Sequence, residues 1–396
     1  MATKQGNWQS RRALLQGLTV AGGAAWLGPS MLANAWGQEA AIDPRVARIV
    51  ADTISVDMHN HDGQPTFAKA PADRKPDPTG VDLPGEMKKA GLSAICLTYA
   101  VDIYRTPQKD DWYQYHLQCL EYDDRLLAKS GMRRALTVAD LKAAHASKTP
   151  IVIQACEGAH WIEGKLERIE EAYKRDLRLM QLPHQMHDLV APLGGLQQLI
   201  VPPGGTQSGT PANVTGLTPF GADVIRECNR LGIVVDMAHA DEETVMGALK
   251  VTQQPLVVTH TALDSEVARS ADLYVGNPGL KARLASKTYA KAVADAGGIM
   301  GIWRIFPTVK DYVTGIKQMV DVVGVDHVGI GTDTSLALLA GGPVPGTNNI
   351  WPDEKNGFLY SVAQEMLTQG FEPDEISRIV GGNYVRLFGN VTRSAA

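Results

Sequence analysis

Short apolar runs alternate with longer amphipathic segments along most of the chain, from about residue 50 onwards. A short apolar run predicts a buried strand, whereas apolar residues spaced three or four apart predict a helix that packs through one face. Strands that alternate with helices in this way are typical of βαβ units, in which crossover helices cover a parallel sheet. The eight expected strands are 54–59, 92–99, 150–157, 177–184, 232–239, 255–260, 297–303 and 327–333.

Amphipathic segments separate most of these runs and are expected to be helices. Eight strand–helix units in roughly 340 residues suit a (β/α)8 TIM barrel with some long loops. A doubly wound sheet is the alternative, but it usually has a glycine-rich phosphate-binding turn after its first strand. No such turn follows the run at 54–59, so we predict the barrel. The expected helices are 82–91, 137–147, 220–231, 241–251, 284–297 and 313–324.

Composition places the chain among ordinary globular proteins, since 44% of its 396 residues are hydrophobic and 20% are charged. The net charge of −5 argues against nucleic acid or an acidic membrane surface as the main partner, because both attract basic proteins. The cysteines show no close-paired spacing, and we expect them to be reduced and mostly buried. They are Cys96, Cys119, Cys156 and Cys228.

The first 35 residues differ from the rest of the chain. Arg11 and Arg12 are followed by a weakly apolar stretch of small residues, and Ala-Asn-Ala at 33–35 fits a small-x-small cleavage site. This pattern predicts a twin-arginine export signal; a retained N-terminal helix is the alternative. A membrane anchor would need about 20 apolar residues, which this stretch does not provide. We therefore expect residues 1–35 to be the signal and residues 36–396 to form one periplasmic catalytic domain without a transmembrane span.

Residues that can bind metal ions gather at the predicted C-terminal ends of the strands. In a (β/α)8 barrel these ends meet at one face, where active sites are built. Five of the ten histidines lie at such ends, together with two carboxylates, so residues far apart in sequence should be neighbours in space. The candidates are His59, His61, Glu157, His184, His239, His260 and Asp333.

Imidazoles and carboxylates without a thiolate match zinc or a similar divalent ion. The candidates exceed the needs of one catalytic ion, which takes about three protein ligands and keeps an open position. They suffice for two ions that share a carboxylate, hold a hydroxide between them and polarise a carbonyl, which implies hydrolysis of an amide or ester. A single histidine at a strand end is more often structural; the joint placement is what favours a metal site.

Other polar residues near these strands leave their roles open. Asp57 and Asp236 lie inside strands beside candidate ligands. Either they accept hydrogen bonds from buried backbone, or they orient an imidazole from behind. His160 and His187 lie just past strand ends and are expected at the rim or in loops.

Several stretches, from about Ser55 to Phe388, resemble the renal (membrane) dipeptidase family of zinc metallopeptidases. The segment GLTPFGADVIRECNRLGIVVDMAHA is close to the family pattern over its whole length. Any one match would be weak, but a run of matches in the same order is specific. The other stretches are DMHNH, CEGAH, VVTHTALDS, DHVGIGTD and IVGGNYVRLF, the last of which resembles the family's C-terminal helix. The resemblance implies a barrel of the metallo-dependent hydrolase type.

The resemblance also implies a metal site with two ions. His59 and the residue at position 61 would bind the first ion, Glu157 would bridge both, and His239 and His260 would complete the second. The family usually has aspartate at position 61, where this chain has His61. An imidazole can still bind zinc, but the site loses one negative charge, which puts the affinity and identity of the first ion in question.

Catalytic and substrate-binding roles follow from the same resemblance. His184 would hold the scissile carbonyl and stabilise the developing oxyanion, and Asp333 would orient the bridging hydroxide and pass a proton to the leaving amine. The family also has an arginine that binds the substrate carboxylate soon after the strand-six histidine. Arg269 lies near that place with a different spacing, and Arg304 is another basic residue expected at the same face.

We therefore expect a monomeric or homodimeric dinuclear zinc enzyme that hydrolyses dipeptides. The first alternative is another amidohydrolase activity at the same site, such as hydrolysis of a lactone, a cyclic amide or a β-lactam. A non-catalytic periplasmic binding protein that kept the barrel is the alternative from a different class, since sites rather than folds carry function.

Overall fold

The computed structural model describes residues 42–63, 78, 80–101, 111–184, 193, 216–271, 283–337 and 346–393. Structural statements below refer to these residues. The predicted export signal at 1–35 and the predicted loop residue His187 lie outside the described residues.

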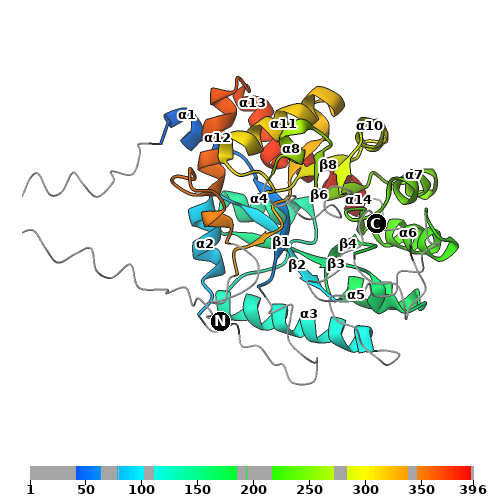
Figure 1. The fold of residues 1–396 in the computed structure, drawn as a ribbon. Coiled ribbons are helices and arrows are strands. Elements are labelled where there is room, and N and C mark those ends of the chain that lie inside the picture. Colours follow the sequence, from blue (N-terminus) through cyan, green and yellow to red (C-terminus); the bar gives the residue numbers. More distant parts are fainter. Residues whose placement is uncertain are drawn as a thin grey trace, which may run out of the picture. The chain divides into compact units, whose positions relative to one another are not determined.

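Eight parallel strands close into a barrel, and each lies within one of the eight predicted runs or overlaps it (Figure 1). The first strand pairs with the second on one side and with the last on the other, where Asp57 lies opposite Ile330. The predicted (β/α)8 barrel is confirmed, and the doubly wound alternative is excluded because an open sheet would keep two edges. The strands are β1 (Val56–His61), β2 (Ala94–Ala100), β3 (Ile151–Glu157), β4 (Leu177–Gln181), β5 (Val234–Asp236), β6 (Val257–Leu263), β8 (Ile299–Ile302) and β9 (Val328–Ile330).

Helices surround the barrel and alternate with its strands (Figure 1). All six predicted helices are present, as α2 (Leu83–Ala90), α4 (Val138–Ala146), α6 (Pro219–Leu231), α7 (Glu242–Val251), α10 (Lys287–Asp295) and α11 (Val309–Val323). The expected C-terminal helix is α14 (Asn383–Arg393). The structure adds α1 (Pro44–Asp52), α3 (Asp111–Ser130), α5 (Glu167–Lys174), α8 (Glu266–Arg269), α12 (Phe358–Thr368) and α13 (Pro373–Ser377). Short elements complete the described fold: η2 (His160–Ile162), η4 (Val325–His327), η5 (Thr347–Asn349), a π-helical turn (Arg378–Gly382), and the two-residue strands β7 (Leu284–Ala285) and β10 (Thr334–Ser335).

The local sequence at the two ends of helix α6 explains where the following strand, β5, begins. The Thr218 side chain accepts a hydrogen bond from the Gly221 amide at the start of α6, and Pro219 occupies the first turn, where its missing N–H costs nothing. The helix ends at Gly232, whose φ of 75° lies in the left-handed region that glycine adopts most easily. The chain then enters β5 directly, which fixes where this strand begins.

Apolar side chains fill the lower part of the barrel, by which we mean the interior near the N-terminal ends of its strands. Val56, Met58, Ile153 and Val257 belong to one buried cluster that also includes Phe388 of α14, so the C-terminal helix closes this end. A second cluster lies between the strands and the outer helices. Because the lower interior is occupied, buried polar side chains of the strands gather at the opposite, C-terminal ends.

Two further observations concern the expectations about membrane spans and thiols. Among the described residues, no helix combines the length and apolar character needed to cross a membrane. All four cysteines lie among the described residues, are buried and form no disulfide, which agrees with the expected reduced thiols.

Candidate metal centre and active site

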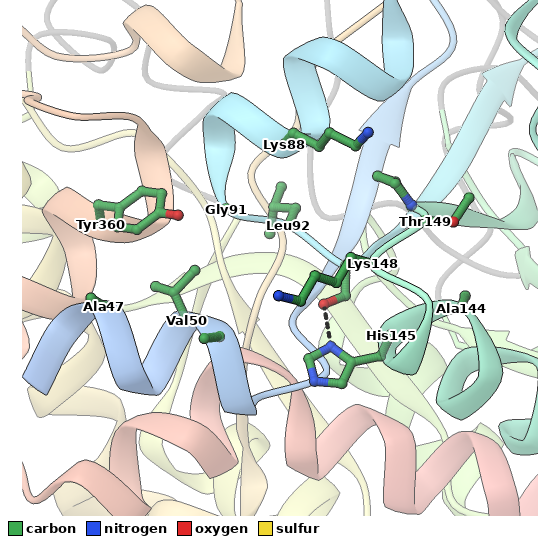
Figure 2. Close-up of a pocket in the computed structure, with 13 residues that line it drawn as sticks. Ala47, Val50, Lys88, Gly91, Leu92, Ala144, His145, Lys148, Thr149 and Tyr360 are labelled. Atoms are coloured by element: carbon green, nitrogen blue, oxygen red, sulfur yellow. Dashed lines mark hydrogen bonds between the residues drawn. The ribbon is translucent and has the colours of Figure 1, made fainter.

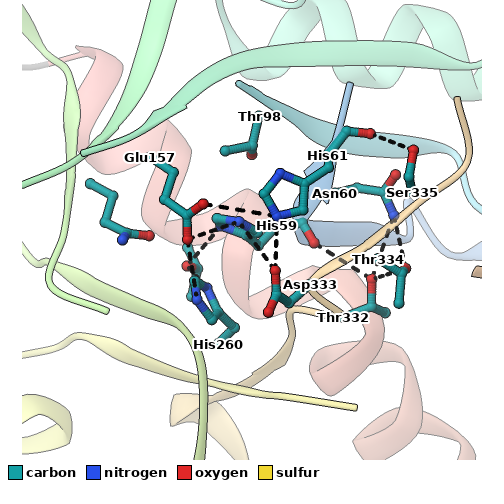
Figure 3. Close-up of polar contacts among 12 residues, drawn as sticks. His59, Asn60, His61, Thr98, Glu157, His260, Thr332, Asp333, Thr334 and Ser335 are labelled. Carbon is teal, nitrogen blue, oxygen red and sulfur yellow. Dashed lines mark hydrogen bonds and ion pairs between the residues drawn. The ribbon is translucent and has the colours of Figure 1, made fainter. Parts of the chain in front are cut away.

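Glu157, the last residue of β3, lies at the centre of a cluster of histidines at the C-terminal end of the barrel (Figure 3). Its Oε2 lies 3.9 Å from Nε2 of His61. Its Oε1 lies 3.7, 3.5, 3.3 and 3.6 Å from the Nε2 atoms of His59, His184, His239 and His260, respectively. Asp333 joins the cluster through Oδ1, 2.9 Å from His61 Nε2 and 3.9 Å from His59 Nε2. The structure thus brings together all seven residues that the strand-end pattern selected.

The spacing of these atoms fits metal binding. A tetrahedral ion with bonds of about 2.0–2.1 Å to nitrogen and oxygen places two of its ligand atoms about 3.3–3.4 Å apart. The four distances from Glu157 Oε1, between 3.3 and 3.7 Å, are close to this value. In addition, the buried His59 Nε2 has no hydrogen-bond partner among the described residues. The donor set, its spacing and this unpaired nitrogen are all compatible with divalent ions.

Two groups of candidate ligands share Glu157. One contains His59, His61 and Asp333, and the other contains His184 and His239. His260 lies 2.9 Å from His239 through their Nε2 atoms and also groups with His59. A carboxylate common to two groups is the arrangement that a shared, bridging ligand requires.

Burial keeps most of these imidazoles neutral. Loss of solvation lowers the pKa of His59, His239 and His260 well below its usual value, and neighbouring cationic groups lower it further. A neutral imidazole offers a nitrogen lone pair, which is the form that binds a metal. Three side chains of the cluster are therefore held in their ligand form at neutral pH.

His61 and Asp333 behave differently because they form a pair. Burial alone would lower the pKa of His61, but the hydrogen bond to Asp333 and the charge of Glu157 raise it to about 9. For Asp333, burial alone would raise the pKa, but the hydrogen bond from His61 outweighs this effect and holds the pKa of Asp333 below its usual value. A metal ion that binds His61 must displace this proton, so metal binding should release a proton and weaken as the pH falls.

Backbone irregularities aim the side chains at the centre. The pairing of β1 with β2 shifts by one residue between Asp57 and Asn60, and that of β6 with β8 shifts between Val258 and Thr261. Such bulges reverse the alternation of side chains along a strand and are frequent beside active sites. The shift in β1 allows Met58 to pack in the barrel core while His59 and His61 both reach the cluster. The shift in β6 spans His260.

Two site residues have backbone conformations that are unfavourable for residues other than glycine. His239 and Asp333 have φ angles of 68° and 57°. Such conformations cost of order 1–3 kcal/mol each and persist only where surrounding contacts impose them. For Asp333, one of these contacts is the hydrogen bond from its amide to the His59 carbonyl, at 3.0 Å.

Asp236 takes both of the roles that its sequence position left open. Its Oδ1 accepts hydrogen bonds from the amides of Ala238 and Thr259, at 2.9 and 3.0 Å, and its Oδ2 accepts the Thr259 hydroxyl at 2.5 Å. With that hydroxyl proton engaged, Thr259 Oγ1 must accept from Nδ1 of His260, 3.0 Å away. This assigns the proton of His260 to Nδ1 and leaves Nε2 to face the cluster.

Asp57 binds backbone and hydroxyl groups. Its Oδ1 accepts hydrogen bonds from the backbone amides of His59 and Thr332. Its Oδ2 accepts hydrogen bonds from the Thr332 hydroxyl and from the side-chain amide of Asn60. Burial raises the pKa of Asp57 to about 6 and that of Asp236 to about 7, despite these hydrogen bonds. Both acids stabilise the ends of the strands that carry the histidines.

Of the two arginines that the sequence suggested for the substrate carboxylate, only Arg304 lies beside the cluster. Arg269 is exposed and forms an ion pair with Asp264, at 2.5 Å, so we do not assign it to the site. Arg304 is half-buried and donates to the Asp333 carbonyl at 3.4 Å, which places it beside the cluster.

Arg283 is the site residue that the sequence did not reveal. It is buried, its Nη2 donates to His239 Nε2 at 2.8 Å, and its Cζ lies 3.8 Å from the centre of the Trp303 ring. It precedes β7, which has only two residues and therefore leaves no recognisable apolar run. An arginine between apolar residues, in KARLA, was the one available signal.

A separate cavity of about 250 Å³ lies at the opposite ends of the strands (Figure 2). Ser93 and Pro150, which line it, immediately precede the segments of β2 and β3. His145 is hydrogen-bonded there to Ser93, at 3.1 Å, and the two lysines of the lining, Lys88 and Lys148, are exposed. None of the described residues that line this cavity carries a carboxylate, so they do not form a metal-binding group like that around Glu157.

Comparison with known proteins gives one family. Residues 44–396 match the sequence model of the family described as membrane dipeptidase (peptidase family M19). Dipeptidase 3 of Mus musculus is 28% identical over 183 residues, which cover 45% of this chain and 34% of that protein. Dipeptidase verJ of Clonostachys rogersoniana is 24% identical over 242 residues, or 59% of this chain and 54% of that protein. These alignments thus span only about a third to a half of the relatives' length.

Solved structures share the fold. The probable dipeptidase PvdM from Pseudomonas aeruginosa superposes with a TM-score of 0.67 at 16% identity, over 89% of this chain and 100% of that chain. A metallo peptidase from Rhodobacter sphaeroides, liganded with a phosphinate mimic of the dipeptide L-Ala-D-Ala, gives a TM-score of 0.60 at 20% identity, over 86% and 100%. At these identities the likeness shows a common barrel.

Proposed function

We propose that this chain, which belongs to the membrane dipeptidase family (peptidase family M19), hydrolyses dipeptides by a metal-dependent mechanism. The observation that carries this proposal is the position of Glu157, with its carboxylate oxygens 3.3–3.9 Å from the Nε2 atoms of five histidines. The names of the similar dipeptidases support the choice of substrate.

The metal ions would be two, and zinc is the ion expected from a set of imidazoles and carboxylates. The residues that would hold them are His59, His61, Glu157, His239 and His260. Bound ions of this kind supply an activated hydroxide at neutral pH and polarise the amide carbonyl.

His184 and Asp333 would then complete the reaction. His184 is buried, with Nε2 3.5 Å from Glu157 Oε1, so it can donate a hydrogen bond to the carbonyl oxygen as negative charge develops there. Asp333 carries its carboxylate at the same centre, and its ionised form can accept a proton and pass it to the nitrogen of the leaving amine. His184 is buried and Asp333 is only partly exposed, so water screens these interactions less than it would at the surface.

Arg283, rather than Arg269, would bind the carboxylate of the dipeptide. A buried guanidinium at the edge of the cluster favours an anionic partner, and its position over Trp303 limits its movement. Arg304 would contribute a second positive charge beside Asp333.

Arg283→Met is expected to raise KM for dipeptides by roughly 10- to 100-fold, since hydrogen bonds to charged groups contribute about 1.5–3 kcal/mol. Activity on dipeptide amides, which lack the carboxylate, should change little. The measurement is steady-state kinetics on both substrate types. Arg269→Met, which removes an exposed arginine, is the matched control and should leave both unchanged. Equal loss on acids and amides would show that Arg283 does not recognise the carboxylate.

A substrate panel tests the reaction itself. Metal-loaded protein is assayed on dipeptides, longer peptides, lactones, cyclic amides and β-lactams. Turnover of dipeptides at the highest kcat/KM is the expected result. Turnover confined to lactones, cyclic amides or β-lactams would assign the site to another amidohydrolase reaction. Binding without turnover of any compound would favour the non-catalytic binding protein.

We also propose that the chain is exported to the periplasm by the twin-arginine route, on the basis of Arg11, Arg12 and the cleavage site at 33–35. Replacing both arginines with lysine should leave an uncleaved precursor in the cytoplasm, because the export machinery reads the pair. Cell fractionation with immunoblotting measures this. Lysine at Arg133 and Arg134, a pair outside the signal, is the control. Unchanged export of the double-lysine signal variant would contradict the proposal.

A further inference from the structure

Five buried polar side chains form a closed ring of hydrogen bonds behind Asp333. Asn60 comes from β1, Thr332 and Thr334 flank Asp333, and Thr347 belongs to η5, outside the barrel strands. Asp57 completes the ring (Figure 3 shows Asn60, Thr332 and Thr334). All five have 0% of their surface exposed, so each polar atom depends on its neighbours.

The direction of each hydrogen bond follows from the donors available. Asn60 Oδ1 accepts from the Leu336 amide at 2.9 Å, which orients the Asn60 side chain and turns its Nδ2 towards the ring. The two N–H groups of Nδ2 donate to Asp57 Oδ2 at 2.9 Å and to Thr347 Oγ1 at 3.0 Å.

The hydroxyls then donate in one direction around the ring. Thr347 donates to Thr334 at 2.6 Å, and Thr334 donates to Thr332 at 2.6 Å. Thr332 donates to Asp57 Oδ2 at 2.6 Å, which closes the ring. Each hydroxyl donates once and accepts from another ring member, so loss of one leaves a buried partner unsatisfied.

This ring holds the residues on both sides of Asp333. Asp333 has a φ of 57°, an unfavourable conformation that needs support from its surroundings. Its own amide contributes one hydrogen bond, to His59, and the ring fixes the neighbours Thr332 and Thr334. The other four ring members lie within two positions of His59, His61 or Asp333 in the sequence. Thr347 does not, because it reaches the ring from η5, a separate turn after β10.

We propose that Thr347 is a positioning residue of the reaction: its hydroxyl completes the ring that holds Asp333 in the backbone conformation from which its carboxylate serves the substrate. The inference rests on the proposed function, because it assigns proton transfer to Asp333. The hydroxyl of Thr347 is hydrogen-bonded to Thr334 and Asn60, so it acts on Asp333 through these neighbours and not by direct contact with the histidine cluster.

The test compares Thr347→Val, which keeps the shape and removes the hydroxyl, with Thr347→Ser, which keeps the hydroxyl. For Thr347→Val, kcat for a dipeptide should fall by about 10- to 100-fold with KM within about twofold, since a small misplacement of a catalytic group has effects of this size. Thr347→Ser should retain most of kcat, and metal content per chain should stay at the wild-type value in both. Thr368→Val, which removes an exposed helical hydroxyl, is the control.

A double-mutant cycle identifies the partner. In an Asp333→Asn background, measured at high enzyme concentration, Thr347→Val should cause no further loss, because the group that it positions is gone. The inference would be overturned if kcat were unchanged in Thr347→Val. It would also be overturned if Thr347→Val lowered kcat as much in the Asp333→Asn background as in the wild type, or if the fall in kcat matched a fall in metal content per chain. If Thr347→Val is not obtained folded, Thr347→Ala takes its place with the same criteria.

Amide hydrogen exchange gives a readout independent of activity. Peptides covering 332–337 should exchange faster in Thr347→Val than in the wild type or Thr347→Ser, because the ring no longer holds this segment. Unaltered exchange would overturn the inference. A wild-type protein without dipeptide turnover but with this exchange response would refute the proposed function and leave the ring's structural role intact.

Discussion

Glu157→Gln is expected to lose bound metal and dipeptide hydrolysis together. The substitution keeps the shape of the side chain but removes the negative charge that lies 3.3–3.7 Å from four imidazoles through one oxygen atom. Two divalent ions next to an uncharged amide would repel each other without compensation. Metal assistance is worth several kcal/mol, and about 4 kcal/mol corresponds to roughly a 10³-fold loss in kcat/KM.

Metal analysis after dialysis and kinetics on the same sample measure this effect. Glu163→Gln is a matched control, since Glu163 is also buried and follows the same strand, but it pairs with Arg168 at 2.8 Å. That variant should lose stability while keeping its metal content. A Glu157→Gln protein that retains two ions and wild-type kcat would show that Glu157 does not bridge them.

Asp333→Asn is expected to lower kcat by about 10³-fold with little change in KM, because general acid–base catalysis contributes typically 10²–10⁴-fold. Asparagine keeps the size of the side chain and can still interact with His61, but it cannot accept and release a proton at its oxygen. Metal content per chain should therefore remain close to that of the wild type. Steady-state kinetics and metal analysis separate this result from that for Glu157→Gln.

Asp326→Asn provides the comparison for this prediction. Asp326 is half-exposed and pairs with Arg378 at 2.9 Å, and its loss should leave kcat unchanged. If Asp333→Asn kept kcat within about threefold of the wild type, the proton transfer of a general base would have to be assigned elsewhere.

The strands and the metal cluster could be predicted from sequence because each depends on a simple rule. Apolar runs such as PIVIQACE identify strands that are buried on both faces, and the barrel brings their C-terminal ends together. Glu157 and His61 are the last residues of their strands, so their proximity follows from the fold. Helix α5 was not predicted, because it buries only Arg168, Ile169 and Ala172, and this apolar face is too short to recognise in the sequence.

Features that depend on pairing between strands could not be predicted. The bulge in β1 allows Met58 to pack in the barrel core although the adjacent His59 faces the cluster, and it arises from the register with β2. Arg283 reaches His239 from a segment 44 residues further along the chain, and no local pattern indicates this contact. The ring through Thr347 likewise joins residues up to 287 positions apart.

His61 stands where the resembling family usually has aspartate, and the structure shows what this residue contacts. Its Nε2 lies 2.9 Å from Asp333 and 3.9 Å from Glu157, so the imidazole occupies a position from which it can bind the first ion. The site then has one negative charge less to balance two divalent ions. We therefore expect the first ion to bind more weakly than the second.

Metal bound per chain and dipeptide turnover, measured together while metal-free protein is titrated with Zn²⁺, test the central claim most directly. The account predicts no turnover without metal, and turnover that increases with loading and reaches a plateau at two ions per chain. Turnover that persists in the metal-free protein, or its absence in the fully loaded protein, would contradict it.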